Sequence, residues 1–266
     1  MAANRAFIAI LFLLSTVFSY GQSTASKQVS TFTIDAPQLN TQKKIWIYLP
    51  KNYTASTKKY PVLYMHDAQN LFDAKTSYVG EWNVDETLDS LNAQVIVVGI
   101  EHGNEKRIEE LTPYRNEKYG GGKADSYLDF IVSTLKPEID KKYRTKTDAR
   151  HTTIMGSSLG GLVSFYAILK YPKVFGKAGV FSPSFWFTKD IYELAENQKK
   201  IKAKIFFLCG DDEDKETVPD MERMIDIVAG KRCECKHLTK KVIIKGGKHN
   251  EKLWRENFAK AYLWLE

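Results

Sequence analysis

The sequence predicts an α/β fold in which helices cover both faces of a mainly parallel β-sheet. After residue 60, short apolar runs typical of buried strands alternate with longer segments of helical spacing. Strands separated by helices of about 10 to 15 residues form β-α-β units, whose strands run parallel. The second observation is a G-x-S-x-G sequence, Gly156 to Gly160, which lies between one such strand and one such helix.

The expected elements follow one another in a regular order. Thr31 to Ile34 and Lys43 to Leu49 alternate apolar and polar residues, which predicts two antiparallel edge strands with Ile45, Ile47 and Leu49 on one face. The others are strand 61–65, helix 84–91, strand 94–100, helix 125–143, strand 152–155, helix 161–171, strand 177–181, helix 188–200, strand 204–209, helix 218–229, strand 242–245 and helix 251–265. Pro137 predicts a kink or break in the helix that contains it. The polar stretch 101–123 is expected to be an excursion or lid over the site.

The first 21 residues have the features of a secretory signal peptide. Arg5 is followed by an apolar stretch, 6–17, and by the small-x-small sequence Ser19-Tyr20-Gly21, so cleavage is expected before Gln22. The alternative, an uncleaved anchor, is disfavoured because a membrane span needs about 20 apolar residues. We therefore expect an exported protein, periplasmic or secreted, with one domain over residues 22–266.

Charge and cysteine content exclude several classes of function. The formal net charge is +7, but the lysines are scattered in pairs rather than gathered in a stripe with aromatic residues, which argues against nucleic-acid binding. Cys209, Cys233 and Cys235 are too few for a disulfide scaffold; Cys209 is expected in the core, and a pairing with Cys233 or Cys235 stays open. We expect neither a metal ion nor another cofactor.

A G-x-S-x-G sequence between a strand and a helix predicts a nucleophile elbow. The turn is so sharp that Ser158 would be held out over the edge of the sheet. The following helix would point its free N–H groups at the same place, where an oxyanion could be stabilised. The alternative is a glycine-rich turn without a catalytic role. The flanking strand and helix favour Ser158 as a nucleophile, with the amide of Leu159 as one oxyanion donor.

A serine hydroxyl needs a base, and of the five histidines His249 has the expected place. In this type of fold the base follows the last strand, in the chain order serine, acid, histidine. His249 lies in a turn between the last expected strand and the last helix, whereas His237 lies in a lysine-rich loop. His66 and His102 follow the ends of strands and could lie near the site; His151 begins the elbow strand.

The acid that orients the base is expected in the loop after the strand 204–209. This loop contains four consecutive carboxylates, Asp211, Asp212, Glu213 and Asp214. A solvated acidic loop is one alternative reading, and a calcium loop is another, although the alternating spacing of calcium ligands is absent. Position alone does not select one of the four. The second oxyanion amide is expected from the segment 67–70.

These motifs resemble the Putative esterase family of α/β-hydrolases, relatives of feruloyl esterases, siderophore trilactone esterases and S-formylglutathione hydrolases. The resemblance covers the chain from about Lys43 to the C-terminus. It is carried by residues 63–73, Trp82, Asp85-Glu86, 98–100, Arg107, 110–114, 155–161, 180–186, 218–221, 247–251 and Trp254-Arg255. It implies an α/β-hydrolase fold and a serine carboxylic-ester hydrolase.

The resemblance also implies roles for particular residues. A Gly-x-x-acid pattern indicates Glu213 as the acid, with Asp212 and Asp214 as neighbouring alternatives, and the oxyanion loop contributes the backbone amide of Gln69. Ala68 departs from the glycine of many relatives and suggests a slightly tighter loop.

Three functional hypotheses follow. The first is a serine esterase acting on a small-molecule or polysaccharide-linked ester, such as an acylated polysaccharide or a siderophore ester. Its pocket could be lined by Trp82, Phe185 and Trp186, although all three could equally belong to the core. The second is an acyltransferase with the same triad, and the third is a catalytically inactive homologue that binds a ligand. Oligomeric state and acyl specificity are not predicted.

Overall fold

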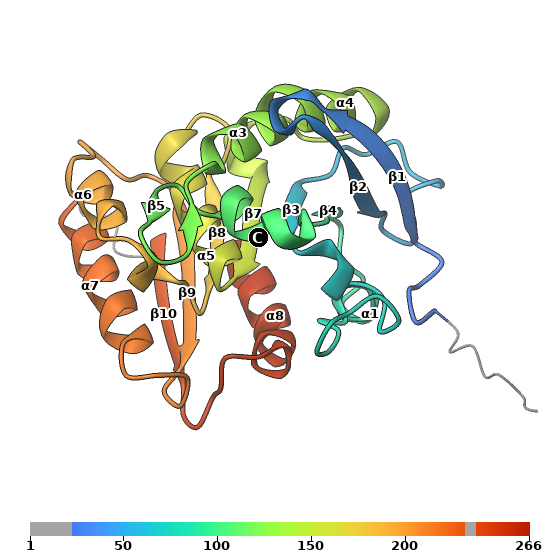
Figure 1. Ribbon diagram of the computed structural model, residues 1–266. Coiled ribbons are helices and arrows are strands. Elements are labelled where there is room, and N and C mark those ends of the chain that lie inside the picture. Colours follow the sequence, from blue (N-terminus) through green and yellow to red (C-terminus); the bar gives the residue numbers. More distant parts are fainter. Residues whose placement is uncertain (1–22, 232–237) are drawn as a thin grey trace, which may run out of the picture.

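The computed structural model describes residues 23–231 and 238–266. Its centre is an eight-stranded sheet of order β1-β2-β4-β3-β7-β8-β9-β10, with helices on both sides (Figure 1). The strands are β1 (Val29–Ala36), β2 (Thr41–Tyr48), β3 (Val62–His66), β4 (Ile96–Ile100), β7 (Thr152–Ser157), β8 (Lys177–Phe181), β9 (Lys204–Gly210) and β10 (Thr239–Ile244). The helices are α1 (Val84–Ser90), α2 (Arg107–Leu111), α3 (Ala124–Asp129), α4 (Lys136–Lys142), α5 (Leu159–Lys170), α6 (Asp190–Glu196), α7 (Thr217–Gly230) and α8 (Glu251–Leu265). The predicted signal peptide, His237, Cys233 and Cys235 lie outside the described residues.

The pairing of the strands confirms the predicted fold class. β1 pairs antiparallel with β2, and β2 pairs antiparallel with β4, so both antiparallel pairs lie at one edge. All pairs from β4 through β3, β7, β8 and β9 to β10 are parallel. The carboxyl ends of the parallel strands therefore meet at one edge of the sheet, where ligands bind in open α/β sheets.

Two hydrophobic clusters fill the two faces of the sheet. Residues alternate along each strand, so Ile45 and Ile47 of β2 enter one cluster while Trp46 and Tyr48 enter the other. The first cluster also takes in apolar residues of α3 to α7, and the second takes in α1 and α8. Strands that are buried on both faces need apolar residues at successive positions, which explains the continuous apolar runs in the sequence.

The long predicted helix 125–143 is divided into three parts. A π-helical segment, Phe130–Leu135, separates α3 from α4. Pro137 lies in the first turn of α4, where its missing N–H costs no hydrogen bond of that helix. The predicted interruption is therefore confirmed, although it extends over the turn before the proline. Helix α6 ends at Glu196, before the expected end at residue 200.

The polar excursion contains ordered structure that sequence patterns did not predict. It forms α2 and a short hairpin of β5 (Arg115–Asn116) and β6 (Gly120–Gly121) (Figure 1). Gly120, Gly121 and Gly122 have φ of +75°, +89° and +94°, a region that side chains with a Cβ avoid. The side-chain amide of Asn116 donates to the carbonyl of Phe187 at 2.6 Å, which fixes the hairpin against the segment after β8.

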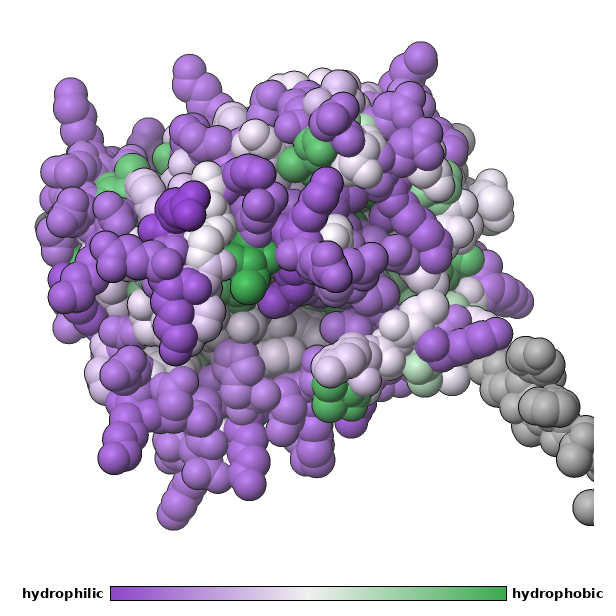
Figure 2. All heavy atoms as spheres, in the orientation of Figure 1, coloured by the Kyte–Doolittle hydropathy of each residue, from purple (hydrophilic) through white to green (hydrophobic). Residues whose placement is uncertain are grey.

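Across the residues that the structure describes, every helix is too short or too polar to cross a bilayer. The face seen in Figure 2 is mainly hydrophilic, with a small hydrophobic area near the middle of the view, beside the hairpin. Cys209 is buried and unpaired, and burial raises the pKa of its thiol to about 12, as expected for a core cysteine.

Candidate active site

Ser158 lies on a strained turn between β7 and α5. Its backbone has φ +58° and ψ −123°, which is rare for a residue with a side chain and typical of functional sites. A Cβ at Gly156 would lie 2.9 Å from Gly160 and from His66, and one at Gly161 would lie 2.7 Å from the carbonyl of Phe181. Glycine is thus needed on both sides of the serine, and the predicted elbow has the expected geometry.

The segment after β8 is hydrogen bonded to the serine. The Ser158 amide donates to the Phe181 carbonyl at 2.9 Å, and the Ser184 amide donates to the Ser158 carbonyl at 3.2 Å. The two hydroxyl oxygens of Ser158 and Ser184 are 3.2 Å apart. Among the described residues, Ser184 and not His249 is the hydrogen-bond partner of the Ser158 hydroxyl.

His249 and Glu213 are brought together by the loops after β10 and β9. Nδ1 of His249 lies 2.8 Å from Oε2 of Glu213. The Glu213 side chain is completely buried, and that of His249 is 37% exposed. A hydrogen bond from Nδ1 to a carboxylate leaves Nε2 as the free, basic nitrogen of the neutral ring. The pair therefore has the geometry of an acid that orients a base.

The other three acids of this loop have different partners. Asp211 accepts the amide of Gly246 at 2.6 Å, and Asp214 accepts the amides of Glu216 and Thr217 at the start of α7. The Asp212 side chain is 63% exposed and lies 3.8 Å from Lys248. Geometry thus separates four acids that were indistinguishable by position, and it leaves Glu213 alone beside the imidazole.

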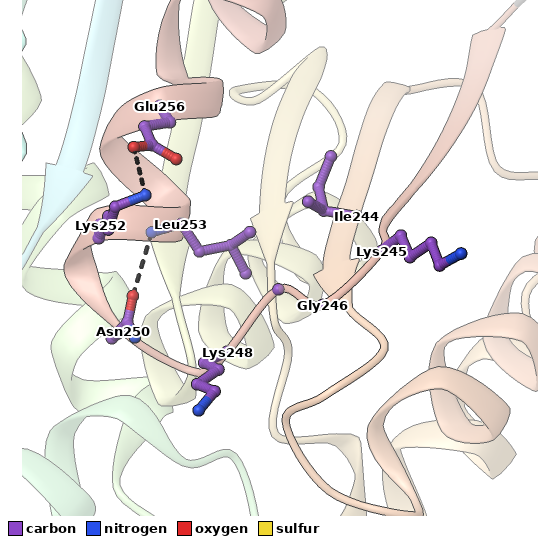
Figure 3. Close-up of a pocket in the computed structure, with 9 residues that line it drawn as sticks. Ile244, Lys245, Gly246, Lys248, Asn250, Lys252, Leu253 and Glu256 are labelled. Carbon is purple, nitrogen blue, oxygen red and sulfur yellow. Dashed lines mark hydrogen bonds and ion pairs between the residues drawn. The ribbon is translucent and has the colours of Figure 1, made fainter.

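The His249 loop is held from both sides. Figure 3 shows Ile244, Gly246 and Lys248 leading from β10 to α8 along a pocket that also touches Leu253. Asn250 caps α8 by accepting the amide of Leu253 at 3.1 Å, and the Gly247 amide donates to the carbonyl of Ile244 at 3.0 Å. A Cβ at Gly210 would lie 2.0 Å from the Gly247 carbonyl oxygen. The acidic loop after β9 and the His249 loop after β10 are therefore in direct contact.

Ser182 and Trp254 complete the surroundings of Glu213, and sequence patterns did not indicate either role. Oε1 of Glu213 accepts the Ser182 hydroxyl at 2.6 Å and the Gly210 amide at 2.7 Å. The indole N–H of Trp254 donates to the Ser182 oxygen at 2.8 Å, and the same indole lies edge-on to the His249 ring at 5.2 Å. Because Ser182 and Ser184 belong to one short segment, that segment contacts both the acid and the serine.

The predicted oxyanion amides belong to a short 3₁₀ turn after β3 and to the start of α5. Gln69 lies in a 3₁₀ turn, Ala68–Asn70, and Leu159 is the first residue of α5. Among the hydrogen bonds at turns, loops and helix ends of the described residues, none is donated by the backbone amide of Gln69 or of Leu159. The methyl group of Ala68 is buried, and a Cβ at Gly99 would lie 2.9 Å from it. Gly99 therefore provides the space that Ala68 occupies.

Asp67 starts this turn and is paired with Arg107 of α2. Oδ1 and Oδ2 of Asp67 accept Nε and Nη2 of Arg107, both at 2.8 Å, and Asp67 itself has φ +56°. Burial opposes ionisation of Asp67, but the guanidinium outweighs it and holds the pKa below its usual range. A Cβ at Gly160 would lie 3.4 Å from Oδ2, so this ion pair lies directly against the elbow.

The remaining described histidines have structural partners. Nδ1 of His66 is 2.7 Å from the Tyr127 hydroxyl, and burial lowers the pKa of His66 to about 4. His102 accepts the amide of Asn104, and His151 pairs with Asp148 at the start of β7.

The aromatic residues proposed for a pocket separate into core and surface. Trp82 is 3% exposed and packs against Phe181, Trp254 and Phe258. Phe185 is completely buried, so both belong to the core rather than to an open pocket. Trp186 is 44% exposed and contacts Tyr119 of the hairpin, with the ring centroids 5.8 Å apart. Only Trp186 of the three is accessible to a ligand.

Comparison with known proteins gives the family. Residues 36–265 match the family described as "Putative esterase". The chain is 27% identical over 241 residues to "Uncharacterized protein YbbA" of Bacillus subtilis (strain 168), covering 84% of this chain and 92% of that protein. It is 27% identical over 181 residues to "Endo-1,4-beta-xylanase/feruloyl esterase" of Xylanibacter ruminicola, covering 65% of this chain and 23% of that longer protein.

A solved structure supports the same fold. The BES protein from Bacillus cereus superimposes with a TM-score of 0.73 at 20% identity, and the match covers 92% of this chain and 97% of that one. The mainly parallel eight-stranded sheet with helices on both sides agrees with this likeness of fold. The chain therefore belongs to the Putative esterase family and is a carboxylic-ester hydrolase with the α/β-hydrolase fold.

Proposed function

We propose that the protein hydrolyses esters through an acyl-enzyme, with Ser158 as nucleophile, His249 as base and Glu213 as the acid that orients it. The observation that carries this proposal is the 2.8 Å hydrogen bond between His249 and the buried Glu213, at the same sheet edge as the strained Ser158. The segment hydrogen bonded to both Ser158 and Glu213 supports this arrangement.

The residues suggest the following sequence of steps. The Ser158 hydroxyl leaves Ser184 and donates to Nε2 of His249, a bond that forms fully only when substrate is bound. Its oxygen attacks the ester carbonyl, His249 takes the proton, and the amides of Gln69 and Leu159 stabilise the oxyanion. His249 then gives the proton to the leaving alcohol. Water, activated by the same histidine, releases the acid and restores Ser158.

The surroundings of Ser158 favour an aromatic acyl group. Trp186 follows the segment that contacts Ser158, and its exposed ring faces Tyr119 of the hairpin. Flat aromatic acids can stack on such rings, and an aromatic pair adds about 1 kcal/mol of stabilisation beyond that from the apolar area it buries. The relative named as a feruloyl esterase acts, by that name, on esters of an aromatic acid, and a polysaccharide acylated with such an acid would present one.

An ester panel tests the proposal. Purified protein is assayed with acetyl, feruloyl and benzoyl esters and with a thioester of one of these acids, beside the Ser158→Ala variant. We expect hydrolysis of oxygen esters with a preference for aromatic acids, and no turnover by Ser158→Ala. Equal rates in the wild type and Ser158→Ala would overturn the nucleophile assignment. Equal rates for acetyl and aromatic esters would overturn the acyl preference alone.

We further propose that residues 1–21 direct export and that residues 22–266 form the mature domain. The motivation is the arrangement of Arg5, the apolar stretch and Ser19-Tyr20-Gly21. N-terminal sequencing of the exported protein should begin at Gln22; a retained residue 1 would contradict it.

A further inference from the structure

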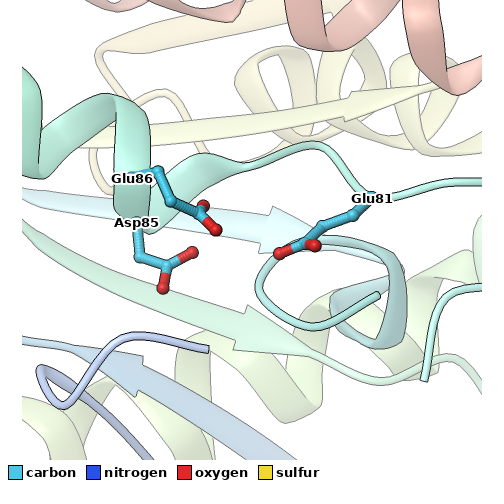
Figure 4. A group of neighbouring side chains, drawn as sticks. All are labelled: Glu81, Asp85 and Glu86. Atoms are coloured by element: carbon cyan, nitrogen blue, oxygen red, sulfur yellow. The ribbon is translucent and has the colours of Figure 1, made fainter. Parts of the chain in front are cut away.

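Three carboxylates converge away from the proposed catalytic residues. Glu81 lies on the loop before α1, and Asp85 and Glu86 lie in the first turns of that helix. One oxygen of each lies within 4.8 Å of the others, and Figure 4 shows the three carboxylates pointing toward a common space. Asp85 is completely buried and Glu81 is 5% exposed, so water screens the repulsion between these two only weakly, whereas the Glu86 side chain is more open to solvent.

The charge of this group is not balanced by the protein. Within residues 23–231 and 238–266, the ion pairs do not include Glu81, Asp85 or Glu86. Arg255 approaches, but its guanidinium donates to the backbone carbonyl of Glu81 at 2.7 Å. Buried charges in proteins are normally paired or bound to a metal ion.

The hydrogen bonds around the group leave a set of buried oxygens unused. Thr24 donates to Oε2 of Glu81 at 2.9 Å, and the amide of Ser26 donates to Oδ2 of Asp85 at 2.6 Å. Oε1 of Glu81, Oδ1 of Asp85 and Oε2 of Glu86 are buried and accept no hydrogen bond from the described residues, and Oγ of Ser26 is buried without a partner among them. An unsatisfied buried acceptor costs about 1–3 kcal/mol, and more when charged. Four such atoms in neighbouring residues therefore indicate a missing positive ligand.

We propose that Glu81, Asp85 and Glu86 bind a divalent cation, Ca²⁺ by their chemistry, with Ser26 as a neutral oxygen ligand. Ca²⁺ takes six to eight oxygen ligands in flexible geometry, whereas Mg²⁺ retains several waters and needs a regular octahedron. Zinc and the softer metals prefer nitrogen and sulfur, which this group does not offer. Two positive charges would offset most of the three negative ones.

The cation would join the start of the described chain to the loop beside the oxyanion turn. The Ser23 hydroxyl and the Thr24 amide donate to Asp73, which follows the Gln69 turn, and the Thr24 hydroxyl donates to Glu81. A cation on Glu81, Asp85 and Ser26 would fix both segments to α1. The proposal concerns stability and does not depend on the catalytic roles given above.

Metal binding to the purified protein tests the proposal. Protein freed of metal with EDTA is titrated with Ca²⁺ at pH 7.5 by calorimetry and with Tb³⁺ by luminescence, which Trp82, adjacent to Glu81, should sensitise. We expect one Ca²⁺ per chain and a Tm raised by about 5 °C or more at 100 times Kd. Glu81→Gln and Glu86→Gln should each weaken Ca²⁺ binding at least about tenfold. Because they relieve repulsion, they should match or exceed the wild-type Tm in EDTA.

Glu222→Gln is the matched control, because Glu222 is exposed and pairs with Lys241 on α7 and β10. It should bind Ca²⁺ like the wild type. Equal Tm values in Ca²⁺ and EDTA, together with no heat of binding at millimolar Ca²⁺, would overturn the proposed cation site. A proton shared by Asp85 and Glu86 would then reduce the negative charge of the group. Binding that survives Glu81→Gln and Glu86→Gln would overturn it as well. Neither result bears on ester hydrolysis, which the Ser158→Ala assay tests separately.

Discussion

The Nδ1 atom of His249 lies 2.8 Å from Oε2 of Glu213, a carboxylate that water does not reach. Two further donors, the Ser182 hydroxyl and the Gly210 amide, occupy the other oxygen. A carboxylate held in this way has one orientation, and so does the imidazole bound to it. His249 and Glu213 are far apart in the sequence, but the loops that carry them follow β10 and β9, and these loops meet because the two strands are parallel neighbours.

Replacement of this acid should impair catalysis much more than replacement of its neighbours. Glu213→Gln keeps the size of the side chain but cannot stabilise the imidazolium, so we expect kcat to fall by about 10³- to 10⁴-fold. Asp212→Asn is the control, since the Asp212 side chain is exposed and its ion-pair partner is Lys248; its kcat should stay within about twofold. Steady-state kinetics on a p-nitrophenyl ester measures both. A larger loss in Asp212→Asn than in Glu213→Gln would reassign the acid.

Ser182 and Trp254 should act as positioning residues for Glu213. Trp254→Phe removes the N–H that holds the Ser182 oxygen, and Ser182→Ala removes the hydroxyl that Glu213 accepts. We expect each to lower kcat by roughly tenfold with KM nearly unchanged. Ser182→Ala removes a hydrogen bond to a charged group, which is worth about 1.5–3 kcal/mol, and Trp254→Phe loosens the hydroxyl that makes this bond. Trp264→Phe, on the same helix, is the control for removal of an indole. A change in Tm without a change in kcat would show that the two residues serve stability only.

The contact between Gly99 and Ala68 should make their substitutions interdependent. Gly99→Ala would place a Cβ 2.9 Å from the Ala68 methyl and 3.0 Å from Phe72, so we expect a loss of about 1–3 kcal/mol in unfolding free energy and a lower kcat as the Gln69 turn shifts. Ala68→Gly in the same chain removes the first of these contacts. The double variant should recover part of both losses, as a double-mutant cycle would measure. Additive losses would show that the two positions are independent.

Burial of His66 should make stability depend on pH below neutrality. The pKa of His66 is lowered to about 4 from 6.5, so between these values the unfolded chain binds the proton more strongly. The contribution is complete above pH 6.5 and is lost as pH falls to about 4, a total of about 3 kcal/mol. Urea unfolding from pH 7 to pH 4 should show this slope in the wild type. His66→Asn should flatten the dependence of unfolding free energy on pH. An equal dependence in the variant and the wild type would show that His66 is not its cause.

Much of the fold was predictable because its elements carry their own signals. Helix α8 was predicted with its observed bounds from an aromatic-rich segment, and in the structure Asn250 caps its start. Strand β8 was predicted equally well from a short apolar run. The hairpin of β5 and β6 was not predicted, because two-residue strands show no periodicity and its fixed shape depends on glycine conformations and on Asn116 contacting Phe187.

The candidate site was predictable where chain order or a local turn defines it. Ser158 and His249 follow from their places after strands, whereas Glu213 needed the family resemblance because four acids share one loop. The contact of Trp254 with Ser182 spans 72 residues, so sequence gives no sign of it. Trp82 and Phe185 were predicted as possible pocket residues yet are buried, because aromatic residues look alike in sequence whether buried or exposed.

We propose that His249 activates Ser158 by accepting the proton of its hydroxyl group. The most direct measurement is peptide mapping of the folded protein after reaction with a fluorophosphonate probe, which bonds to an activated serine oxygen. We expect one adduct per chain, on Ser158, in the wild-type protein and at least a hundredfold slower labelling of Ser158 in His249→Ala. Labelling at another serine, or equally fast labelling of Ser158 in His249→Ala, would contradict it.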